Sequence, residues 1–362
     1  MERRALLKLA GLAAAGGGLA SPAIAATAPD ITWRLTSSFP ALLDNLYGGA
    51  EIFSRAVSDL TDGHFTIEIH PSGEIATALN AFDLVAKGEI QCAQTALHYH
   101  WGVEPALVFA TAVPFGMNAR QQNAFFRQGG GNDLFNELLQ PHNLFALPAG
   151  NTGCEMGGWF RRELKSAADL KGLRFRISGM AGKVVQKLGC VPQAVARNDL
   201  ASAFEAGTLD AAAWVAPVDD EKLGLTRVAP YYYYPGWFQG SMAVHIVLNL
   251  EAWNNLPKAY QAAIRAAAEL ANAEMQARYD AQNTAALKRL VATGAQLRGF
   301  PGDVMEACWQ ATNDTFAEMA EASESFRRAQ DLYLAFRNDE YLWWQVGEYT
   351  YDNFIIRQRA KG

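Results

Sequence analysis

A short pattern that occurs twice in this chain strongly constrains its fold. Residues 84–93 and 203–212 both read as the end of a helix, a glycine, and then a short strand of small residues. Gly88 and Gly207 stand where a helix commonly ends on a glycine, because glycine tolerates a positive φ. Two such units, about 120 residues apart, predict two similar α/β lobes.

The spacing of apolar residues predicts alternating strands and helices in the first lobe. Strands are expected at 31–35, 65–70 and 90–95, and helices at 44–60 and 77–87. This alternation predicts a mostly parallel sheet. Residues 256–290 lack glycine and keep helical spacing, which predicts a helix of about 50 Å running along both lobes. Residues 302–337 also have a helical pattern.

The first 25 residues are typical of an export signal. Arg3 and Arg4 precede an apolar run, Ala5 to Ala20, and Ala23-x-Ala25 is a small-residue cleavage site. The run is shorter than the roughly 20 residues that a spanning helix needs. The paired arginines suit the twin-arginine route, and a Sec signal fits nearly as well. We therefore expect cleavage after residue 25 and a mature protein in the periplasm.

Charge and cysteine content exclude some classes of partner and of fold. Residues 1–25 carry three basic residues and one acidic residue, so their removal changes the formal charge from −6 to −8. Such a chain is a poor partner for nucleic acid, which requires a basic face. Cys92, Cys154, Cys190 and Cys308 are widely spaced, so we interpret them as small buried residues, with one disulfide as the alternative.

Arg176 is the candidate binding residue with the clearest chemical logic. It lies on a short strand in which Phe175 and Ile177 are expected on one face and Arg176 on the other. Ligands of α/β sheets bind at the carboxyl ends of strands, and a guanidinium there suits bidentate capture of a carboxylate. The alternative is a surface arginine paired with Asp or Glu.

An enzyme is not expected. The sequence contains no G-x-S-x-G, H-E-x-x-H or G-x-x-x-x-G-K-[ST] motif, so an exported hydrolase is the least favoured class. The pair His98-x-His100 suggests zinc, but no third ligand is evident.

In order along the chain, several motifs resemble the substrate-binding proteins of TRAP (tripartite ATP-independent periplasmic) transporters, the DctP family. The motifs common to the family are at 51–53, 61–65, 71–75, 169–176 and 207–210. Those similar to its 2-oxoacid-binding branch are at 150–153, 157–160, 219–222 and 231–237. The resemblance implies two α/β lobes that close over one ligand, with Arg176 gripping its carboxylate, and membrane permease subunits as partners.

The resemblance also implies how the chain is divided. Lobe I is expected to comprise 26–150 and about 239–280, and lobe II 151–238 and about 281–325. The remaining 326–362 form a C-terminal helical tail rich in aromatic residues, which fits helix exchange between two protomers. A homodimer is therefore expected, with a monomer as the alternative.

In the 2-oxoacid branch a cation, Na⁺ or Ca²⁺, is commonly bound beside the ligand, and here the sequence departs from the branch. The branch pattern is Gln at 155, Glu at 213 and Glu at 239, whereas this chain has Glu155, Ala213 and Gln239. The pair of carboxylates that the resemblance implies thus becomes one, which is expected on the opposite wall of the cleft. Glu155, the Trp214 carbonyl and Gln239 remain as candidate metal ligands. The alternatives are that Glu155 pairs with Arg176 or meets a donor on the ligand, and the sequence leaves this open.

The remaining candidate ligand contacts are Tyr99, Trp101, Phe115, Glu155 and Trp214. Tyr99 would donate a hydrogen bond to the carboxylate, and Trp101 would form part of the pocket wall. Asp219, Asp220 and Glu221 are expected to charge a helix N-terminus. The expected ligand is a small monocarboxylate, a 2-oxoacid or a related organic acid. A bulkier or aromatic carboxylate, favoured by the space at Ala213, and a sensor that signals to a membrane receptor are the alternatives.

Overall fold

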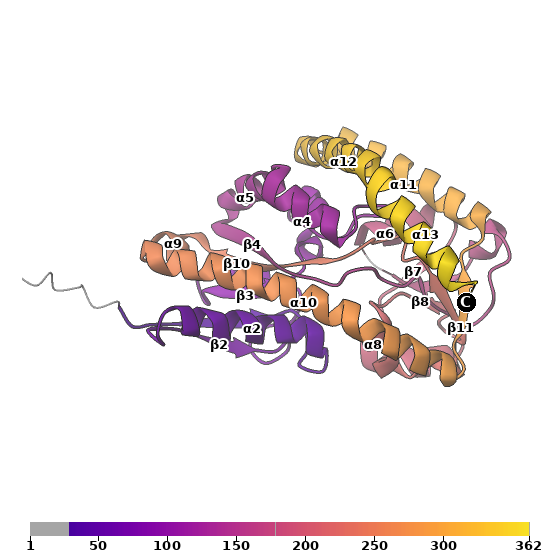
Figure 1. Ribbon diagram of the computed structural model, residues 1–362, viewed down its shortest axis with the longest axis horizontal. Helices are drawn as coiled ribbons and strands as arrows, with labels where there is room; N and C mark the ends of the chain where they lie inside the picture. Colours follow the sequence, from indigo (N-terminus) through magenta and orange to yellow (C-terminus); the bar gives the residue numbers. More distant parts are fainter. Residues whose placement is uncertain (1–28, 178, 362) are drawn as a thin grey trace, which may run out of the picture.

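Two β-sheets frame the computed structural model, which describes residues 29–177 and 179–361 (Figure 1). The expected export signal, 1–25, lies outside the described residues. We call the part around the first sheet lobe I. Its strands, in the order β2-β1-β3-β10-β4, are β1 (Ile31–Ser37), β2 (Phe65–His70), β3 (Cys92–Thr95), β4 (Leu144–Asn151) and β10 (Ala243–Asn249).

The second sheet belongs to lobe II and has the order β11-β9-β5-β8-β6-β7. Its strands are β5 (Gly158–Phe160), β6 (Arg174–Arg176), β7 (Val191–Gln193), β8 (Ala211–Ala212), β9 (Tyr231–Tyr234) and β11 (Gln296–Gly299). The strand β10 belongs to the sheet of lobe I and β11 to the sheet of lobe II. The exact lobe bounds stay a prediction.

The sheets are mixed rather than mostly parallel, which corrects the expectation. In lobe I, β1 pairs in parallel with β2 and β3, but β10 is antiparallel to β3 and β4. In lobe II, β5 is antiparallel to β8 and β9, whereas β6 is parallel to β7 and β8. In each sheet the antiparallel strand, β10 or β5, is the one that the chain enters directly from the other lobe. Alternation of strands and helices in the sequence does not reveal where the chain passes from one lobe to the other, so these antiparallel strands could not be predicted from it.

Helices flank both sheets. Lobe I has α2 (Asp44–Leu60), α3 (Ala81–Ala86), α4 (Ala119–Gln128), α5 (Gly131–Leu139) and α9 (Leu250–Asn254); lobe II has α6 (Gly179–Lys187), α7 (Leu200–Glu205) and α8 (Pro217–Asp220). The long helix α10 (Lys258–Ala292) has 35 residues and extends along both lobes (Figure 1). Its Ile264 is buried in the lobe I core and its Leu290 in the lobe II core, which confirms the predicted spanning helix.

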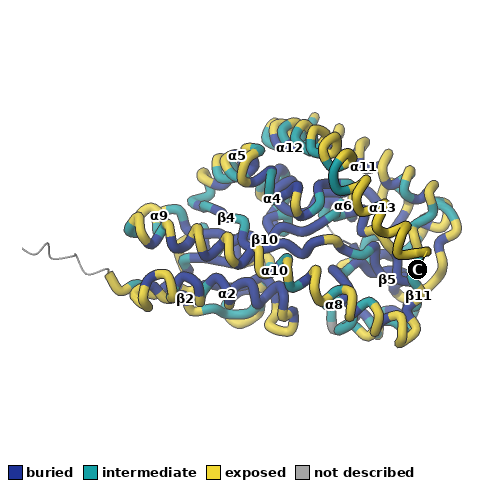
Figure 2. The backbone as a smooth tube through the Cα atoms, viewed as in Figure 1, coloured by how far each residue is buried: buried dark blue, intermediate teal, exposed yellow. Residues whose placement is uncertain are grey.

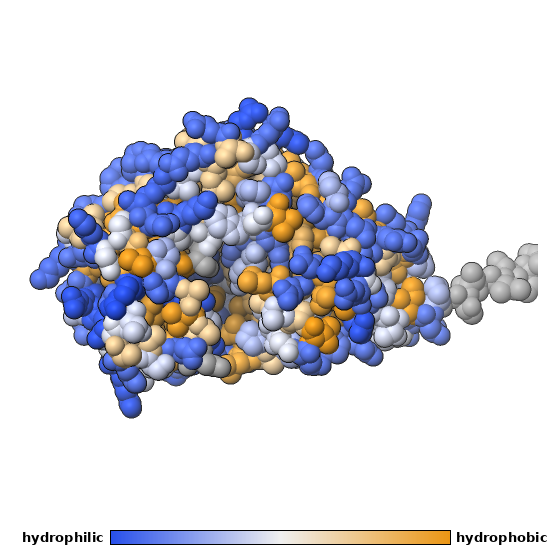
Figure 3. Space-filling model, turned by 180° about the vertical axis from the view of Figure 1, so that it is seen from behind, coloured by the Kyte–Doolittle hydropathy of each residue, from blue (hydrophilic) through white to orange (hydrophobic). Residues whose placement is uncertain are grey.

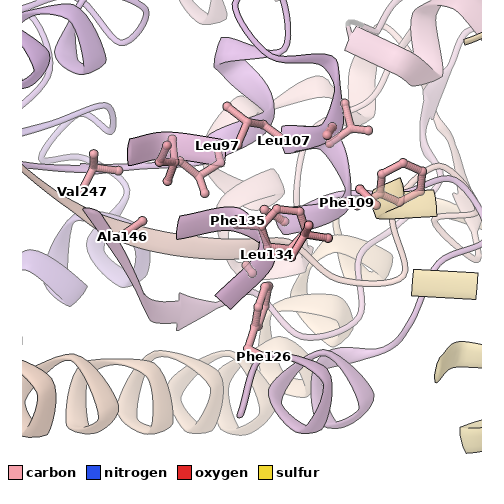
Figure 4. Packing of buried hydrophobic residues seen from close by; sticks show 14 of the residues in the cluster. Leu97, Leu107, Phe109, Phe126, Leu134, Phe135, Ala146 and Val247 are labelled. Carbon is pink, nitrogen blue, oxygen red and sulfur yellow. The ribbon is translucent and has the colours of Figure 1, made fainter. Parts of the chain in front are cut away.

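Lobe I has two core clusters: one joins the sheet to α2 and α10 and includes Ile264, and the other lies between the sheet and α3, α4, α5 and α12. Leu97, Phe109, Phe126, Phe135 and Val247 meet there, and Figure 4 shows their side chains packed together. In Figure 2 the strands are mostly dark blue and the outer turns of the helices yellow, so the sheets carry the buried surface. Within the described residues, no helix combines the length and apolar character needed to cross a membrane.

The expected helix at 302–337 is two helices. Ser323 has extended backbone angles, φ −144° and ψ 121°, and its side chain caps the second helix by accepting from the Phe326 N–H. The first helix, α11 (Gly302–Ala322), packs in lobe II; the second, α12 (Glu324–Trp344), buries Phe326 and Tyr333 in the lobe I core. The chain ends in a π-helical turn, η8 (Gln345–Tyr349), and α13 (Thr350–Arg359).

The four cysteines are free thiols, so the disulfide alternative is wrong. Cys92, Cys190 and Cys308 are buried, as expected, but Cys154 is exposed. Cys154 follows β4 on a chain segment that crosses between the lobes, where its side chain is not enclosed by either core.

Candidate functional site

A cavity of about 510 Å³ lies between the lobes, at the carboxyl ends of the parallel strands. The segments that follow β1, β3, β6 and β8 supply much of its wall. Its polar lining residues include Ser38, Ser72, His98, Tyr99, Arg176 and Gln239, and its apolar ones Leu43, Leu46, Val108, Ala112, Met180 and Met242. Between the two lobes the surface is hollowed, as seen in Figure 3, with apolar residues along the hollow.

Arg176 ends β6 and reaches into this cavity. The neighbouring Phe175 and Ile177 are buried in the lobe II core, as alternation along the strand predicted. Its Nη1 donates to the Ala213 carbonyl (2.8 Å) and its Nε to the Val195 carbonyl (3.5 Å). Among the described residues no carboxylate forms an ion pair with Arg176, so the paired surface arginine is excluded here. Burial lowers the pKa of the guanidinium, and a carboxylate ligand would offset that cost.

Trp214 and Tyr99 surround the guanidinium. The Arg176 Cζ lies 4.7 Å from the centre of the Trp214 ring, a cation–π contact that fixes the plane of the guanidinium. Tyr99 comes from lobe I, and its pKa is raised by burial while the charge of Arg176 opposes that rise. The structure therefore brings the predicted Arg176, Tyr99 and Trp214 together at one cavity wall.

Glu155 lies buried beside this wall, 1% exposed, on the segment between β4 and β5. It accepts from the Thr152 hydroxyl (2.8 Å) and contacts the side-chain amide of Gln239, a cavity residue. Burial raises the pKa of Glu155 to about 8, partly opposed by these two hydrogen bonds. It does not pair with Arg176, whose hydrogen bonds within the described chain go to the Val195 and Ala213 carbonyls.

The contact between positions 155 and 239 changes how the substitution is interpreted. The sequence suggests that the carboxylate moves to the opposite wall of the cleft. In the structure the two side chains touch, so the acid and the amide are exchanged within a single contact. The carboxylate thus stays at the same site, and only the acid at position 213 is lost.

Sequence reasoning missed the environment of Asp219 and Asp220. Both lie in the first turn of α8, as expected, but their side chains are buried. Asp220 accepts from the Tyr232 hydroxyl (2.7 Å), the Trp159 indole (3.2 Å) and the Val215 N–H (3.0 Å). Asp219 accepts from the Tyr279 hydroxyl (2.6 Å) on α10. The aromatic donors lie far away in the sequence, so local spacing gave no signal; the network anchors the 213–215 segment of the wall.

Trp101 and Phe115 lie outside the cavity lining, so the geometry corrects their expected position. The Trp101 ring lies under the Lys183 ammonium, 5.0 Å from its centre, and packs on the lobe I core. Phe115 has a positive φ of 54° and lies between Trp237 (5.5 Å between ring centres) and Trp309 (5.2 Å). Phe115 thus packs between Trp237, in the segment that joins β9 to β10, and Trp309 of α11, away from the cavity.

Three oxygen-bearing groups can hold a cation: the Glu155 carboxylate, the Gln239 amide and the Trp214 carbonyl. Among the described residues, the buried Glu155 carboxylate meets Thr152 and Gln239 but no basic side chain, and no donor bonds to the Trp214 carbonyl. Oxygen ligands of this kind suit Na⁺ or Ca²⁺. No group of three His, Cys, Asp or Glu side chains in the described part of the chain forms a complete metal cluster, and this includes His98 and His100.

Comparisons with known proteins agree with this geometry. A family model, bacterial extracellular solute-binding protein, family 7, matches residues 36–323. A monocarboxylate 2-oxoacid-binding periplasmic protein of Nostoc sp. is 40% identical over 360 residues, 98% of this chain and 99% of that protein.

Two solved structures have the same fold. A TRAP transporter solute binding protein of Bordetella bronchiseptica is 42% identical with a TM-score of 0.88, covering 92% of this chain and 99% of that one. It is a mixed occupancy dimer with calcium and picolinate in one active site and an apo second site. A TRAP periplasmic solute binding protein of Pseudoalteromonas atlantica with sodium and pyruvate is 32% identical, with a TM-score of 0.85 and coverage of 90% and 99%.

Proposed function

We propose that this chain, which belongs to the bacterial extracellular solute-binding protein family 7, captures monocarboxylates that carry an acceptor atom on the carbon next to the carboxylate, 2-oxoacids foremost. It is a solute receptor of a TRAP transporter and not an enzyme. The ligand class follows from the site described above.

A single observation carries the proposal: the Arg176 guanidinium, which has no carboxylate partner among the described residues, faces a largely apolar cavity from the end of a strand. Arg176 uses two of its five N–H groups on protein carbonyls, so three remain for a ligand. A carboxylate accepts two parallel hydrogen bonds from such a fork. The 2-oxoacid-binding relative and the pyruvate and picolinate bound to the solved relatives favour monocarboxylates over dicarboxylates.

The ligands of the two solved relatives share one chemical feature. Pyruvate has a keto oxygen next to its carboxylate, and picolinate has a ring nitrogen at the corresponding position. Each therefore presents two acceptors that one cation can bridge. In this chain Glu155, Gln239 and the Trp214 carbonyl would hold the cation, which would supply a positive charge toward the α-acceptor. Arg176 would orient the carboxylate, and the hydroxyl of Tyr99, another residue of the cavity lining, would donate to it.

Matched acids test the proposal directly. Protein stripped of ligand by unfolding and refolding is titrated calorimetrically with pyruvate, propanoate, picolinate and nicotinate, in Ca²⁺, in Na⁺ and in chelator without Na⁺. We expect pyruvate and picolinate to bind, and their partners without the α-acceptor to bind much more weakly. Equal affinities within each pair would contradict the role of the α-acceptor. Equal affinities for pyruvate with and without the cation would show that the cation takes no part in ligand binding.

A homodimer formed through the tail is the second part of the proposal. The segment 341–356 exposes nine large apolar side chains: Tyr341, Leu342, Trp343, Val346, Tyr349, Tyr351, Phe354, Ile355 and Ile356. No residue of α13 is buried in the single chain. Such a surface requires a partner, and the Bordetella relative is a dimer. Light scattering of the full chain and of a chain ending at Asn338 tests this: we expect twice the monomer mass only for the full chain.

The remaining steps concern the route of the protein and of its ligand. Residues 1–25 are proposed to direct export by the twin-arginine or the Sec route, and substitution of Arg3 and Arg4 by lysine would separate the two. The lobes are proposed to close over the ligand, since the cavity wall comes from both of them. The closed form would then dock on the permease subunits, whose ion gradient drives uptake.

A further inference from the structure

His98 is a cavity residue that the proposed binding mode does not yet use. It lies in the short 3-10 helix η1 (Leu97–His100) directly after β3, in lobe I. Its Cδ2 is 4.0 Å from where a Cβ on Gly179 would be, and Gly179 begins α6 of lobe II, three residues after Arg176. The imidazole edge that carries Nε2 therefore faces the Arg176 side of the cleft.

The hydrogen bonds around Thr111 assign the tautomer of His98. The Thr111 hydroxyl has one proton, which it donates to the Ala243 carbonyl at 2.7 Å. Its oxygen lies 3.4 Å from His98 Nδ1. Since the hydroxyl proton is committed, the hydroxyl oxygen can only accept, so Nδ1 carries the ring proton. The other ring nitrogen, Nε2, is then a bare acceptor.

This acceptor has no partner in the described part of the protein, and it is not sealed off from the cavity. No hydrogen bond to Nε2 occurs there, and Nε2 is not among the fully enclosed polar atoms without a partner. Burial, together with the nearby His100, lowers the pKa of His98 to about 4. The ring is therefore neutral at neutral pH, and Nε2 does not donate.

The nearby polar groups of the cavity do not satisfy this acceptor. The Ser38 hydroxyl lies 2.8 Å from the Ala78 carbonyl and 2.8 Å from Thr95 Oγ1, and the Gln239 amide contacts Glu155. A ligand with acceptor atoms only, such as pyruvate, would leave Nε2 unpaired when the lobes close. A buried acceptor without a donor is unfavourable, so the cavity discriminates against such ligands.

We propose that His98 is a specificity-determining residue whose Nε2 accepts a hydrogen bond from the ligand, and that the preferred ligand is a 2-oxoacid or related monocarboxylate that also carries a hydroxyl or N–H donor. This inference rests on the proposed function and deepens it. Such a ligand would bridge Arg176 of lobe II and His98 of lobe I, and would thereby hold the two lobes closed.

Hydroxypyruvate and 2-oxobutanoate form a matched pair, because a hydroxyl replaces a methyl of similar size. Wild-type protein is expected to prefer hydroxypyruvate by about fivefold to twentyfold. In His98→Asn the amide nitrogen can still donate to Thr111, but no acceptor stands where Nε2 was, so the preference falls to near one. In His98→Phe, where the cavity is more apolar, 2-oxobutanoate becomes the better ligand. Thr111→Val keeps the imidazole ring but removes the oxygen that holds the proton on Nδ1. Both tautomers then become populated, so the preference for hydroxypyruvate falls.

Two results would overturn the inference. One is an unchanged ratio in both His98 variants while pyruvate binding persists. The other comes from long-range ¹H–¹⁵N NMR of the histidines in ligand-free protein: a protonated Nε2 on His98 contradicts the tautomer whether or not any acid binds. Failure of the wild type to bind any 2-oxoacid would overturn the proposed function instead, and the NMR result would still decide the state of His98.

Discussion

Replacement of Arg176 is the perturbation whose outcome follows most directly from the structure. Arg176→Ala removes the guanidinium that faces the cavity and leaves a carboxylate ligand without its charge partner. Truncation of one member of such a buried, hydrogen-bonded charge pair costs about 2–5 kcal/mol. Affinity for pyruvate should therefore fall by about 30-fold to several thousand-fold.

Arg176→Lys separates charge from geometry. A lysine keeps the positive charge, but it cannot hold the Ala213 carbonyl and offer a two-pronged fork at the same time. We expect an intermediate loss, about tenfold to a hundredfold. Arg174 is the matched control, because it lies two residues earlier on the same strand and pairs with Asp210 (2.7 Å) outside the cavity. Arg174→Ala should change affinity by less than about twofold.

Isothermal titration calorimetry of stripped protein measures these affinities, and circular dichroism confirms that each variant is folded. The reasoning fails if Arg176→Ala keeps wild-type affinity, or if Arg174→Ala loses as much as Arg176→Ala. The first result would place the carboxylate elsewhere; the second would mean that the strand as a whole, not the guanidinium, matters.

Three further predictions concern the framework around the site. Tyr333→Phe should lower the free energy of unfolding by about 1–3 kcal/mol in urea, because the buried Met117 N–H loses its acceptor at 2.7 Å; an unchanged midpoint would contradict this, and the exposed Tyr341→Phe is the control. Burial raises the pKa of Asp220 from 3.8 to about 7, so the folded state holds a proton that the unfolded state releases and stability falls as pH rises through that interval. Asp220→Asn should flatten the fall in melting temperature between about pH 4 and pH 7, and an equal slope in both proteins would refute the assignment. Gly49→Ala should destabilise the fold, because the new Cβ would lie 2.4 Å from Met275 Cε and 2.9 Å from Gln94 Nε2. A melting temperature at or above that of the wild type would contradict tight packing of α2 on α10.

Periodic features of the fold could be predicted from the sequence. The helix at 44–60 and the strand at 65–70 agree with α2 and β2, and the spanning helix is α10. Each buries one repeating face, so its spacing is visible locally. The antiparallel β5 and β10 could not be predicted, because they result from crossovers between lobes. The break at Ser323 was missed because apolar spacing continues on both sides of it.

In the site, the position of a residue could be predicted best where its chemistry allows few roles, as for a charged side chain at a strand end. Arg176 sits at a strand end and presents a cation, so pattern and chemistry agree. Trp101 and Phe115 are large apolar residues near cavity segments, and apolar character alone does not say whether a ring faces a cavity or a core. The contact of Glu155 with Gln239 joins residues 84 positions apart, and only the folded chain reveals it. His98 was considered only as half of a metal motif, since its tautomer depends on Thr111 and Ala243.

The most direct test of the central claim is a crystal structure of the protein grown with pyruvate and Ca²⁺, with the cation located by anomalous scattering. We predict the pyruvate carboxylate on the Arg176 guanidinium and an anomalous peak beside Glu155, Gln239 and the Trp214 carbonyl, with the keto oxygen toward it. Pyruvate bound away from Arg176, or a cavity that stays empty at saturating pyruvate and Ca²⁺, would contradict the account.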